Sequence, residues 1–494
     1  MAKGSITSLE LMEHAAKQCT DRLLFSIAKG EFGLAPAFLI VVGMGNNGGD
    51  GLVIARFLSQ AGRSVRVMRV LHKEAASSEH AANHIELLKQ GVSCIDIETL
   101  SKGFEIADNE IVIDCLLGTG VSRPPTELLR NVIRSMNSAG RPIVSIDLPS
   151  GMVEPGSDQV FDPKACIRAD RTFTFEVPRL ALLLAETGPF AGRWELVPIG
   201  LDREVVRASA RFGEWVQSAD VRALLQPRPR FSHKGTYGHA LLLAGSKGMF
   251  GAAVLATKAC LRSGAGLVSA HVPGTLAATM HVTVPEALCS IDPSPGHIGQ
   301  LPDLKGFSAV GIGPGLGADP MTGEVVEALL RSAKNPLVLD ADALDLLANN
   351  RSWLDHLSEN MVLTPHPKEM DRLLGSPSGS GFERLERTRK FAVEHGCIVV
   401  LKGAYTAVCL PDGTVQFNST GNAGMAKGGS GDVLTGLLTG LLAQGYTPQH
   451  AALIAVHLHG TAGDLAAEAL GMDAMHAGDL IEYLPQAWKM LRQT

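Results

Sequence analysis

The chain has 494 residues, more than one hydrophobic core usually holds, and a typical domain length of about 150 residues predicts at least two units. Hydrophobic residues make up 45% and charged residues 19% of the chain, as in ordinary α/β proteins. The net charge of −6, without any run of Lys or Arg, argues against nucleic acid as a partner.

The amino-terminal segment MAKGSITSLELMEHAAKQ has no apolar core of the kind that a secretory signal needs. No later stretch approaches the roughly 20 apolar residues of a membrane span. The eight cysteines are scattered without a CxxC pair, which is typical of reduced thiols. We therefore expect a soluble, cytoplasmic protein without a membrane partner.

Short apolar runs alternate with helical patterns in the first half of the chain. The runs are rich in Val and Ile and end at Gly, Asp or Ser, as buried parallel strands do. They lie at 37–43, 64–71, 110–118 and 142–150. This alternation predicts an α/β fold, a Rossmann-like doubly wound sheet with its loops at the carboxyl ends of the strands.

Three polar segments follow strands of this predicted sheet. The Gly-rich sequence GNNGGDG, residues 45–51, comes after the first strand and before a helix expected to start near Leu52. Backbone N–H groups at such a helix start can bind an anion, although glycines are also needed merely to close a tight turn. Asp114 leads into residues 118–125 and Asp147 into 148–151. In a parallel sheet all three segments would converge on one crevice.

A second series of strands begins after the Pro- and Arg-rich segment LLQPRPR, which predicts a linker at about 205–230. The strand-like segments that follow are ALLLAGS, FSAVGIGPG, PLVLDADAL, MVLTPHP and CIVVLKG. We therefore predict two domains, 1–210 and 220–494.

The most informative segment of the second half is NSTGNAGMAKGGSGDVLTGLLTGLLAQG, residues 418–445. Its GGSGD core meets a helix of small and apolar residues, so that several backbone amides and the helix dipole would point at one place. This arrangement predicts a phosphate site. Asp432 at the helix start has a simpler alternative role as the N-cap.

Other polar residues of the second half have both functional and structural interpretations. His366 lies between two prolines, which favours a ring that is presented to a ligand rather than packed. Asp340 and Asp342 follow a predicted strand and could orient substrate or metal, or cap the next helix. His457 and His459 are spaced i, i+2 on a predicted helix, which indicates packing residues rather than a metal pair.

The motifs GNNGGDG, DCLLGTGVSRP and IDLPSGM resemble those of the NAD(P)H-hydrate epimerase family over about residues 8–200. The resemblance implies a potassium ion held by Asn47, Asp114 and Ser150, oxygen ligands that suit a hard cation. It also makes Asp147 the candidate acid or base for inversion at C6 of the damaged ring. The residues that would hold the hydrated dinucleotide are Asn46, Asn47, Gly48, Gly49, Asp50, Gly118, Thr119, Gly120, Val121, Ser122, Arg123, Pro124 and Asp147.

The second half resembles the ribokinase superfamily and, within it, the ADP-dependent NAD(P)H-hydrate dehydratases over nearly all of 225–490. The segments that carry this resemblance are HKGTYGHALLLAGSKGMFGAAVLA, VGIGPGLG, VLDADAL, LTPHPKEM, VVLKGAYT and GGSGD. It implies a ribokinase-like α/β domain that uses ADP and magnesium, with Asp432 as the base. Residues implied to contact the hydrated cofactor are Ala253, Gly315, His366 and Asp432. Residues implied to contact the nucleotide are Lys402, Gly403, Ala404, Tyr405, Thr406 and Gly431.

The two resemblances together predict an enzyme that epimerises the R and S hydrates of NADH and NADPH and dehydrates the S form with ADP. Its partners would be these small molecules and, by the same resemblance, further copies of the chain in a homo-oligomer. One alternative is a ribokinase-like kinase of a vitamin precursor, which would leave GNNGGDG unexplained. Another is a degenerate first half that acts as a scaffold, since epimerases usually have an additional helix before the segment that resembles SLELMEHAA. An NAD-dependent dehydrogenase is disfavoured because GMGNNGGDG lacks the GxGxxG spacing.

Overall fold

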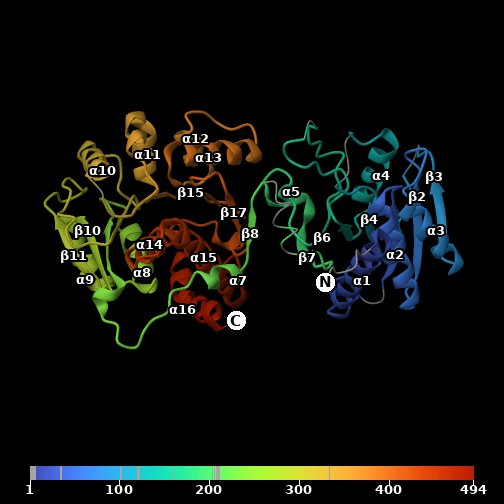
Figure 1. Cartoon of the computed structure of the whole chain (residues 1–494), viewed down its shortest axis with the longest axis horizontal. Helices are drawn as coiled ribbons and strands as arrows, with labels where there is room; N and C mark the ends of the chain where they lie inside the picture. The colour runs from blue at the N-terminus through green and yellow to red at the C-terminus, as the bar shows by residue number, and fades with distance from the viewer. Residues whose placement is uncertain are drawn as a thin grey trace. The chain divides into compact units, whose positions relative to one another are not determined.

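The computed structural model of the chain consists of two compact units, Met1–Ser209 and Ala210–Thr494 (Figure 1). None of the described helices is long and apolar enough to cross a membrane. The residues that the structure describes are 7–33, 36–100, 103–119, 123–157, 159–202, 204, 206, 212–332 and 334–493.

The described residues of the first unit form a seven-stranded parallel sheet in the order β3-β2-β1-β4-β5-β6-β7. The strands are β1 (Ala37–Val42), β2 (Val65–Val70), β3 (Ser93–Ile97), β4 (Glu110–Cys115), β5 (Ile143–Ile146), β6 (Arg171–Phe175) and β7 (Arg193–Val197). The helices are α1 (Ser8–Ala28), α2 (Asn46–Gln60), α3 (Ser78–Lys89), α4 (Glu127–Ser138), α5 (Leu180–Leu183) and the 3-10 helix η1 (Gly188–Ala191). The predicted doubly wound sheet is confirmed, and its strand order reverses between β1 and β4.

Strand β1 is buried on both faces because its side chains alternate between two cores. Phe38 and Ile40 pack in the cluster that contains Leu52 of α2, whereas Leu39 packs in the cluster that contains Val132 of α4. A parallel strand covered by helices on both sides therefore reads as an unbroken apolar run. The sequence predicted β1, β2, β4 and β5. It missed β3 and β7, whose side chains are mostly exposed or half-buried, and also the buried β6, in which Thr alternates with Phe.

The Gly-rich segment is helical, which corrects the predicted helix start near Leu52. Helix α2 begins at Asn46, so that the glycines occupy its first two turns. A Cβ at Gly48 would overlap the carbonyl oxygen of Gly43, and a Cβ at Gly51 would lie 2.7 Å from Val42 Cγ1. The glycines are therefore needed for the close approach of α2 to the end of β1.

The second unit contains a sheet in the order β11-β10-β9-β12-β13-β14-β15-β16-β17-β8. Most neighbouring pairs are parallel, and only the β15–β16 and β16–β17 pairs among the described strands are antiparallel. The strands are β8 (Glu214–Val216), β9 (His239–Leu243), β10 (Leu267–Pro273), β11 (Leu288–Asp292), β12 (Ala309–Ile312), β13 (Leu337–Leu339), β14 (Met361–Leu363), β15 (Ile398–Leu401), β16 (Ala407–Cys409) and β17 (Val415–Asn418).

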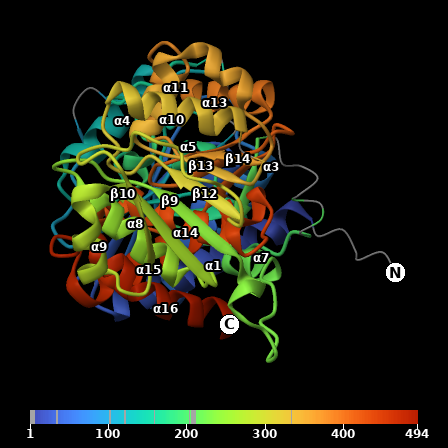
Figure 2. The same cartoon turned by 90° about the vertical axis from the view of Figure 1, so that its left-hand side faces the viewer.

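Helices cover both faces of this sheet, with α8 and α14 on one side and α10, α11 and α13 on the other (Figure 2). The α-helices are α7 (Ser218–Ala223), α8 (Phe250–Arg262), α9 (Ala277–Thr283), α10 (Pro320–Ser332), α11 (Asp342–Asn349), α12 (Pro367–Leu373), α13 (Gly381–His395), α14 (Ser430–Ala443), α15 (Pro448–Leu470) and α16 (Ala477–Gln493). The 3-10 helices are η2 (Lys234–Tyr237), η3 (Gly274–Leu276), η4 (Arg351–His356) and η5 (Ala423–Met425). Strand β8 and helix α7 lie within the stretch 205–230 that was expected to be a linker.

Helix α14 lies unusually close to α8. A Cβ at Gly436 would overlap the carbonyl oxygen of Ala256, and a Cβ at Gly440 would overlap Ser263 Oγ. The small residues that the sequence shows in this helix thus bring its backbone directly onto α8. The contact fixes the start of α14, where the GGSGD segment lies, relative to the sheet.

Candidate functional site

The three polar segments of the first unit meet at the carboxyl ends of β1, β4 and β5. Asn47 Nδ2 donates hydrogen bonds to the carbonyl oxygens of Leu117 (2.8 Å) and Ile146 (3.1 Å). The backbone N–H of Thr119 donates to Asp147 Oδ2 (3.2 Å). A Cβ at Gly118 would lie 3.1 Å from Asn47 Cβ, so this glycine lets the loops close on one another. The three segments therefore meet at the topological switch, as the sequence predicts.

Asp114 is fully buried and organises two of these segments. Its carboxylate accepts hydrogen bonds from Ser145 Oγ (2.8 Å) and from both the backbone N–H (2.8 Å) and the Oγ (2.5 Å) of Ser150. Burial raises the pKa of Asp114, and these hydrogen bonds oppose that rise. The N–H of Leu117 in turn donates to Ser150 Oγ (2.9 Å).

The residues predicted to hold potassium fit a hard cation of low charge. Asn47 Oδ1 is buried without a hydrogen-bond partner among the described residues. The Nδ2 of the same side chain donates to the carbonyl oxygen of Leu117, whose N–H donates to Ser150 Oγ, and this hydroxyl donates to Asp114. Oxygen ligands of this kind suit such an ion. The described part of the chain contains no group of three or more His, Cys, Asp and Glu side chains that could hold a metal ion.

Asp147 has features that are typical of a reacting group. Its φ of 67° lies in the left-handed region, which side chains other than glycine rarely adopt and which often occurs at functional sites. Its Oδ1 is buried without a partner among the described residues. Burial raises the pKa of Asp147, while Arg179 and Thr119 oppose the rise. Burial and the charge of Asp147 also raise the pKa of Asp50 well above its usual value.

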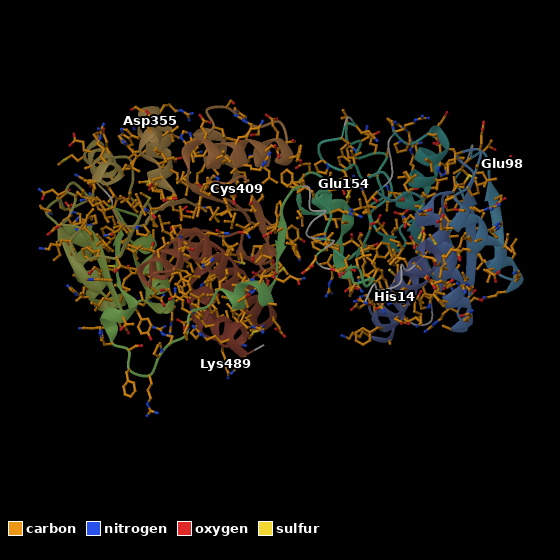
Figure 3. All side chains as sticks on the ribbon, in the orientation of Figure 1. His14, Glu98, Glu154, Asp355, Cys409 and Lys489 are labelled. Carbon is orange, nitrogen blue, oxygen red and sulfur yellow. The ribbon has the colours of Figure 1, made fainter. Side chains whose placement is uncertain are left out.

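Some predicted dinucleotide contacts of the first unit stay predictions. Arg123 and Pro124 are exposed, and Gly120, Val121 and Ser122 lie outside the described residues. No motif in the sequence indicated Arg179. Burial raises the pKa of both Asp147 and Glu154, and the charge of Arg179 opposes that rise (Glu154 is labelled in Figure 3).

Asp432 is not the N-cap of α14, which corrects that alternative. The N-cap is Gly429, with φ 92°, and Asp432 lies in the first turn of the helix. Its carboxyl group is therefore free of the capping role. Burial and the charges of Asp340 and Asp342 raise the pKa of Asp432 to about 6, against the charge of Lys402. A carboxylate with a pKa so close to neutrality is suited to act as a general base.

Lys402 connects this aspartate to the end of β13. Its Nζ lies 2.9 Å from Asp340 Oδ1 and 3.7 Å from Glu369 Oε2. Asp340 Oδ2 accepts a hydrogen bond from Thr435 Oγ1 of α14 (2.7 Å). Although burial alone would lower the pKa of Lys402, Asp340 and Glu369 raise it, so the ammonium stays charged. A fixed positive charge therefore lies at the GGSGD turn.

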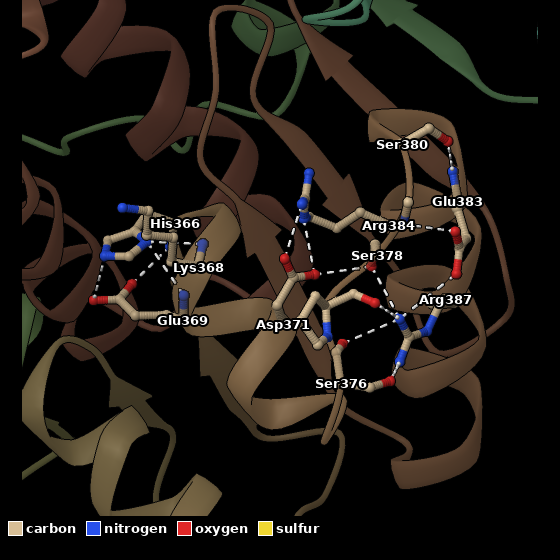
Figure 4. Close-up of polar contacts among 12 residues, drawn as sticks. His366, Lys368, Glu369, Asp371, Ser376, Ser378, Ser380, Glu383, Arg384 and Arg387 are labelled. Atoms are coloured by element: carbon tan, nitrogen blue, oxygen red, sulfur yellow. Dashed lines mark hydrogen bonds and ion pairs between the residues drawn. The ribbon is translucent and has the colours of Figure 1, made fainter.

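His366 is the N-cap of α12 and combines with Glu369 in a capping box (Figure 4). The N–H groups of Lys368 (3.1 Å) and Glu369 (3.2 Å) donate to His366 Nδ1, and the N–H of His366 donates to Glu369 Oε2 (2.6 Å). The side chain of His366 is 44% exposed, so the ring is presented as the sequence predicts. The sequence analysis missed Glu369, although the H-x-x-E spacing of a capping box could have indicated it.

Asp342 stabilises the loop that holds Gly315, and it does not cap a helix. Its Oδ2 accepts a hydrogen bond from the N–H of Gly317 (2.8 Å), while the N-cap of α11 is Ala341 without a side-chain bond. Gly315 has φ 61° and approaches the start of α8, since a Cβ there would lie 2.8 Å from the carbonyl oxygen of Met249. Ala253 of α8 is fully buried.

The predicted nucleotide segment leaves the end of β15 next to Lys402. Gly403 and Ala404 are exposed, and the ring centroid of Tyr405 lies 5.8 Å from that of Trp215 on β8. His457 packs with its Nε2 3.2 Å from Ser218 Oγ. Burial lowers the pKa of His459 to about 4. A backbone contact with Ser430 opposes this shift and the charge of Lys402 adds to it, so His459 interacts with two residues of the site.

Comparisons with known proteins cover both units. Residues 8–181 match the family described as YjeF-related protein N-terminus, and residues 240–486 match NAD(P)H-hydrate dehydratase. The bifunctional NAD(P)H-hydrate repair enzyme of Moorella thermoacetica is 39% identical, and the match covers 99% of this chain and 94% of that protein. The Escherichia coli enzyme of that name is 33% identical, with coverages of 97% and 89%. A ribokinase-like superfamily protein of Enterococcus faecalis has a solved structure that matches 58% of this chain and 99% of its own, at 26% identity and a TM-score of 0.51.

Proposed function

The chain belongs to the family of bifunctional NAD(P)H-hydrate repair enzymes, and from this premise we propose which residues of each unit perform the two reactions. It is an enzyme that restores hydrated NADH and NADPH, by epimerising the R and S hydrates and dehydrating the S form at the expense of a nucleotide. The epimerase site is the crevice of the first unit. The dehydratase site is the GGSGD turn of the second unit.

In the first unit, Asp147 acts on the hydroxyl group at C6 of the damaged ring. Its raised pKa favours the protonated carboxyl, which donates its proton to the hydroxyl as the C6–O bond breaks and water forms. Water then adds to the other face of the ring and returns a proton to Asp147. The start of α2 binds the pyrophosphate with its backbone N–H groups. A potassium ion held by Asn47, Asp114 and Ser150 would supply positive charge beside this pyrophosphate.

In the second unit, Asp432 accepts the proton of the C6 hydroxyl of the S hydrate. The hydroxyl oxygen attacks the terminal phosphoryl group of the nucleotide, which leaves with one phosphate fewer, as AMP from ADP. The new phosphate then leaves C6 as inorganic phosphate while C5 loses a proton to water, and the C5–C6 double bond that forms restores the nicotinamide ring. Lys402 and the first N–H groups of α14 stabilise the charge on the transferred group, which is the main task in phosphoryl transfer. Magnesium would bind chiefly to the nucleotide phosphates, as it commonly does in such sites.

The observation that supports the dehydratase assignment best is the linkage of Asp432, Lys402, Asp340 and Thr435 at the start of α14. The raised pKa of Asp432 suits a general base, and the paired ammonium of Lys402 lies at a helix start whose N–H groups suit an anion. ADP as the preferred nucleotide and association into a homo-oligomer stay predictions from the family resemblance.

Recovery of NADH absorbance from a mixture of both hydrate epimers, with ADP and magnesium, tests the assignment. We expect the full chain to restore the whole mixture, and Asp147→Asn to restore the S hydrate and then stall at the spontaneous epimerisation rate. Asp432→Asn should restore neither epimer while still interconverting them. Full restoration by Asp147→Asn would refute the role of that residue. Accumulation of a phosphorylated vitamin-precursor alcohol without NADH recovery would instead support the kinase alternative.

A further inference from the structure

The strand order of the first unit dictates where the adenosine end of the substrate must lie. Asp147, which faces the reacting ring, follows β5, and the pyrophosphate-binding start of α2 follows β1. The sheet runs β2-β1-β4-β5, so a dinucleotide extended from Asp147 across α2 continues toward β2. Three interstrand spacings, about 14 Å in total, separate β5 from β2. The adenosine ribose therefore reaches the carboxyl end of β2.

The carboxyl end of β2 brings one basic side chain, that of His72, against Gly43 at the end of β1. In the sheet register Arg69 pairs with Val42, the last residue of β1. Just beyond it, His72 Cε1 lies 3.1 Å from where a Cβ of Gly43 would be, so the imidazole covers the entry to α2. Its Nδ1 donates to the carbonyl oxygen of Val70 (3.1 Å), which fixes the ring.

Lys73 is the cation of this region that is available to a ligand. It directly follows His72 in the chain, and its charge adds to burial, the main cause, in lowering the pKa of both His72 and His80. Lys73 is exposed and forms no salt bridge with the described residues. The neighbouring Arg69, by contrast, is engaged by both carboxylate oxygens of Asp96 at 2.8 and 2.6 Å.

Dinucleotide-binding sheets distinguish their two cofactors at this strand end. A carboxylate there accepts a hydrogen bond from the 2′-hydroxyl of NAD, whereas a basic side chain accommodates the 2′-phosphate of NADP. In this chain Asp96 is occupied by Arg69, and Glu74 lies one residue beyond Lys73 and is exposed. His72 and Lys73 thus follow the strand end that the 2′ substituent of the ribose would reach.

We propose that Lys73 selects hydrated NADPH over hydrated NADH in the epimerase site by pairing with the 2′-phosphate, while His72 forms the wall on which the adenosine ribose packs. This inference rests on the proposed function of the first unit. Because a 2′-hydroxyl gains little from an ammonium, Lys73 contributes to only one of the two substrates. His72 contributes to both, since the ribose is common to them.

The test measures interconversion of the R and S hydrates by chromatography, with the full chain and without added nucleotide, so that no dehydration occurs. We expect Lys73→Ala to raise KM for hydrated NADPH about tenfold, the usual effect of losing a hydrogen bond between charged groups, and to leave KM for hydrated NADH unchanged. His72→Ala should raise KM for both. Lys89→Ala is the matched control, because that exposed lysine of α3 pairs with Glu86 and should affect neither substrate.

A second measurement uses the adenosine end alone. Adenosine 2′,5′-bisphosphate should inhibit epimerisation more strongly than adenosine 5′-monophosphate, and Lys73→Ala should abolish this difference. If Lys73→Ala interconverts both hydrates with the same KM values as the wild-type chain, the specificity role is overturned while the proposed function stands. A wild-type chain that interconverts neither hydrate would refute the proposed epimerase function itself.

Discussion

Lowering the pH below about 6 should inactivate the dehydratase by protonating Asp432. The pKa of this carboxyl is raised to about 6 by its burial and by Asp340 and Asp342. At pH 7 roughly 90% of the catalytic base is ionised, and at pH 5 roughly 10%, so kcat/KM for the S hydrate should fall about ninefold between these values. Initial rates of NADH recovery from the S hydrate, with the spontaneous rate subtracted at each pH, give this profile.

One variant tests the cause of this fall in kcat/KM at low pH, the acid limb of the pH profile. Asp342→Asn removes one of the negative charges that raise the pKa of Asp432, while the amide oxygen can still accept the hydrogen bond from Gly317. The acid limb should then move to lower pH. Asp345→Asn is the matched control on the same helix, since Asp345 pairs with Arg372 and does not affect Asp432. A limb that Asp342→Asn leaves in place or moves to higher pH would refute the electrostatic reasoning.

Three further predictions concern stability and ion binding. Asp432→Asn should stabilise the second unit by about 1–3 kcal/mol at pH 7. The pKa of Asp432 is about 6 in the folded state and 3.8 ordinarily, so the ionised carboxylate destabilises the fold once the pH exceeds both values. The gain should vanish near pH 3, and urea unfolding followed by tryptophan fluorescence measures it. Asn47→Leu should abolish stimulation of epimerisation by potassium, whereas sodium-for-potassium exchange in the wild type should only reduce it. Gly436→Ala should destabilise the chain by about 3 kcal/mol or more through its clash with the carbonyl of Ala256, while Gly251→Ala in α8, with open space around its Cβ, should stabilise it by about 0.5–1 kcal/mol.

The sequence predicted several strands that are buried on both faces, but not the equally buried β6 and β10. Strands β1 and β12 read as apolar runs because both of their faces are covered, whereas β11, with Leu288 and Ile291 exposed, carries no such pattern. The convergence of Asn47, Asp114 and Asp147 could likewise be predicted, since parallel strands end at one edge of a sheet.

The parts of the site that escaped prediction depend on distances set by tertiary packing. The contact of Lys402 with Asp340 joins residues 62 positions apart, and no local pattern encodes it. The early start of α2 escaped because glycine has low helix propensity, and its use there is explained only by close tertiary contacts such as those with Gly43 and Val42. The exposure of the His366 ring could be predicted from its flanking prolines, but its role as a helix cap needed the backbone geometry.

The contact between α14 and α8 also constrains how this enzyme can diverge. Any side chain larger than hydrogen at Gly436 or Gly440 meets atoms of α8, so the two helices can change only in concert. The first turn of α14 contains Asp432, the proposed base, and α8 contains Ala253. An evolutionary change of substrate preference that moves either helix therefore requires paired substitutions in both. Within the family, we expect variation at positions 436 and 440 to be accompanied by variation at 256 and 263.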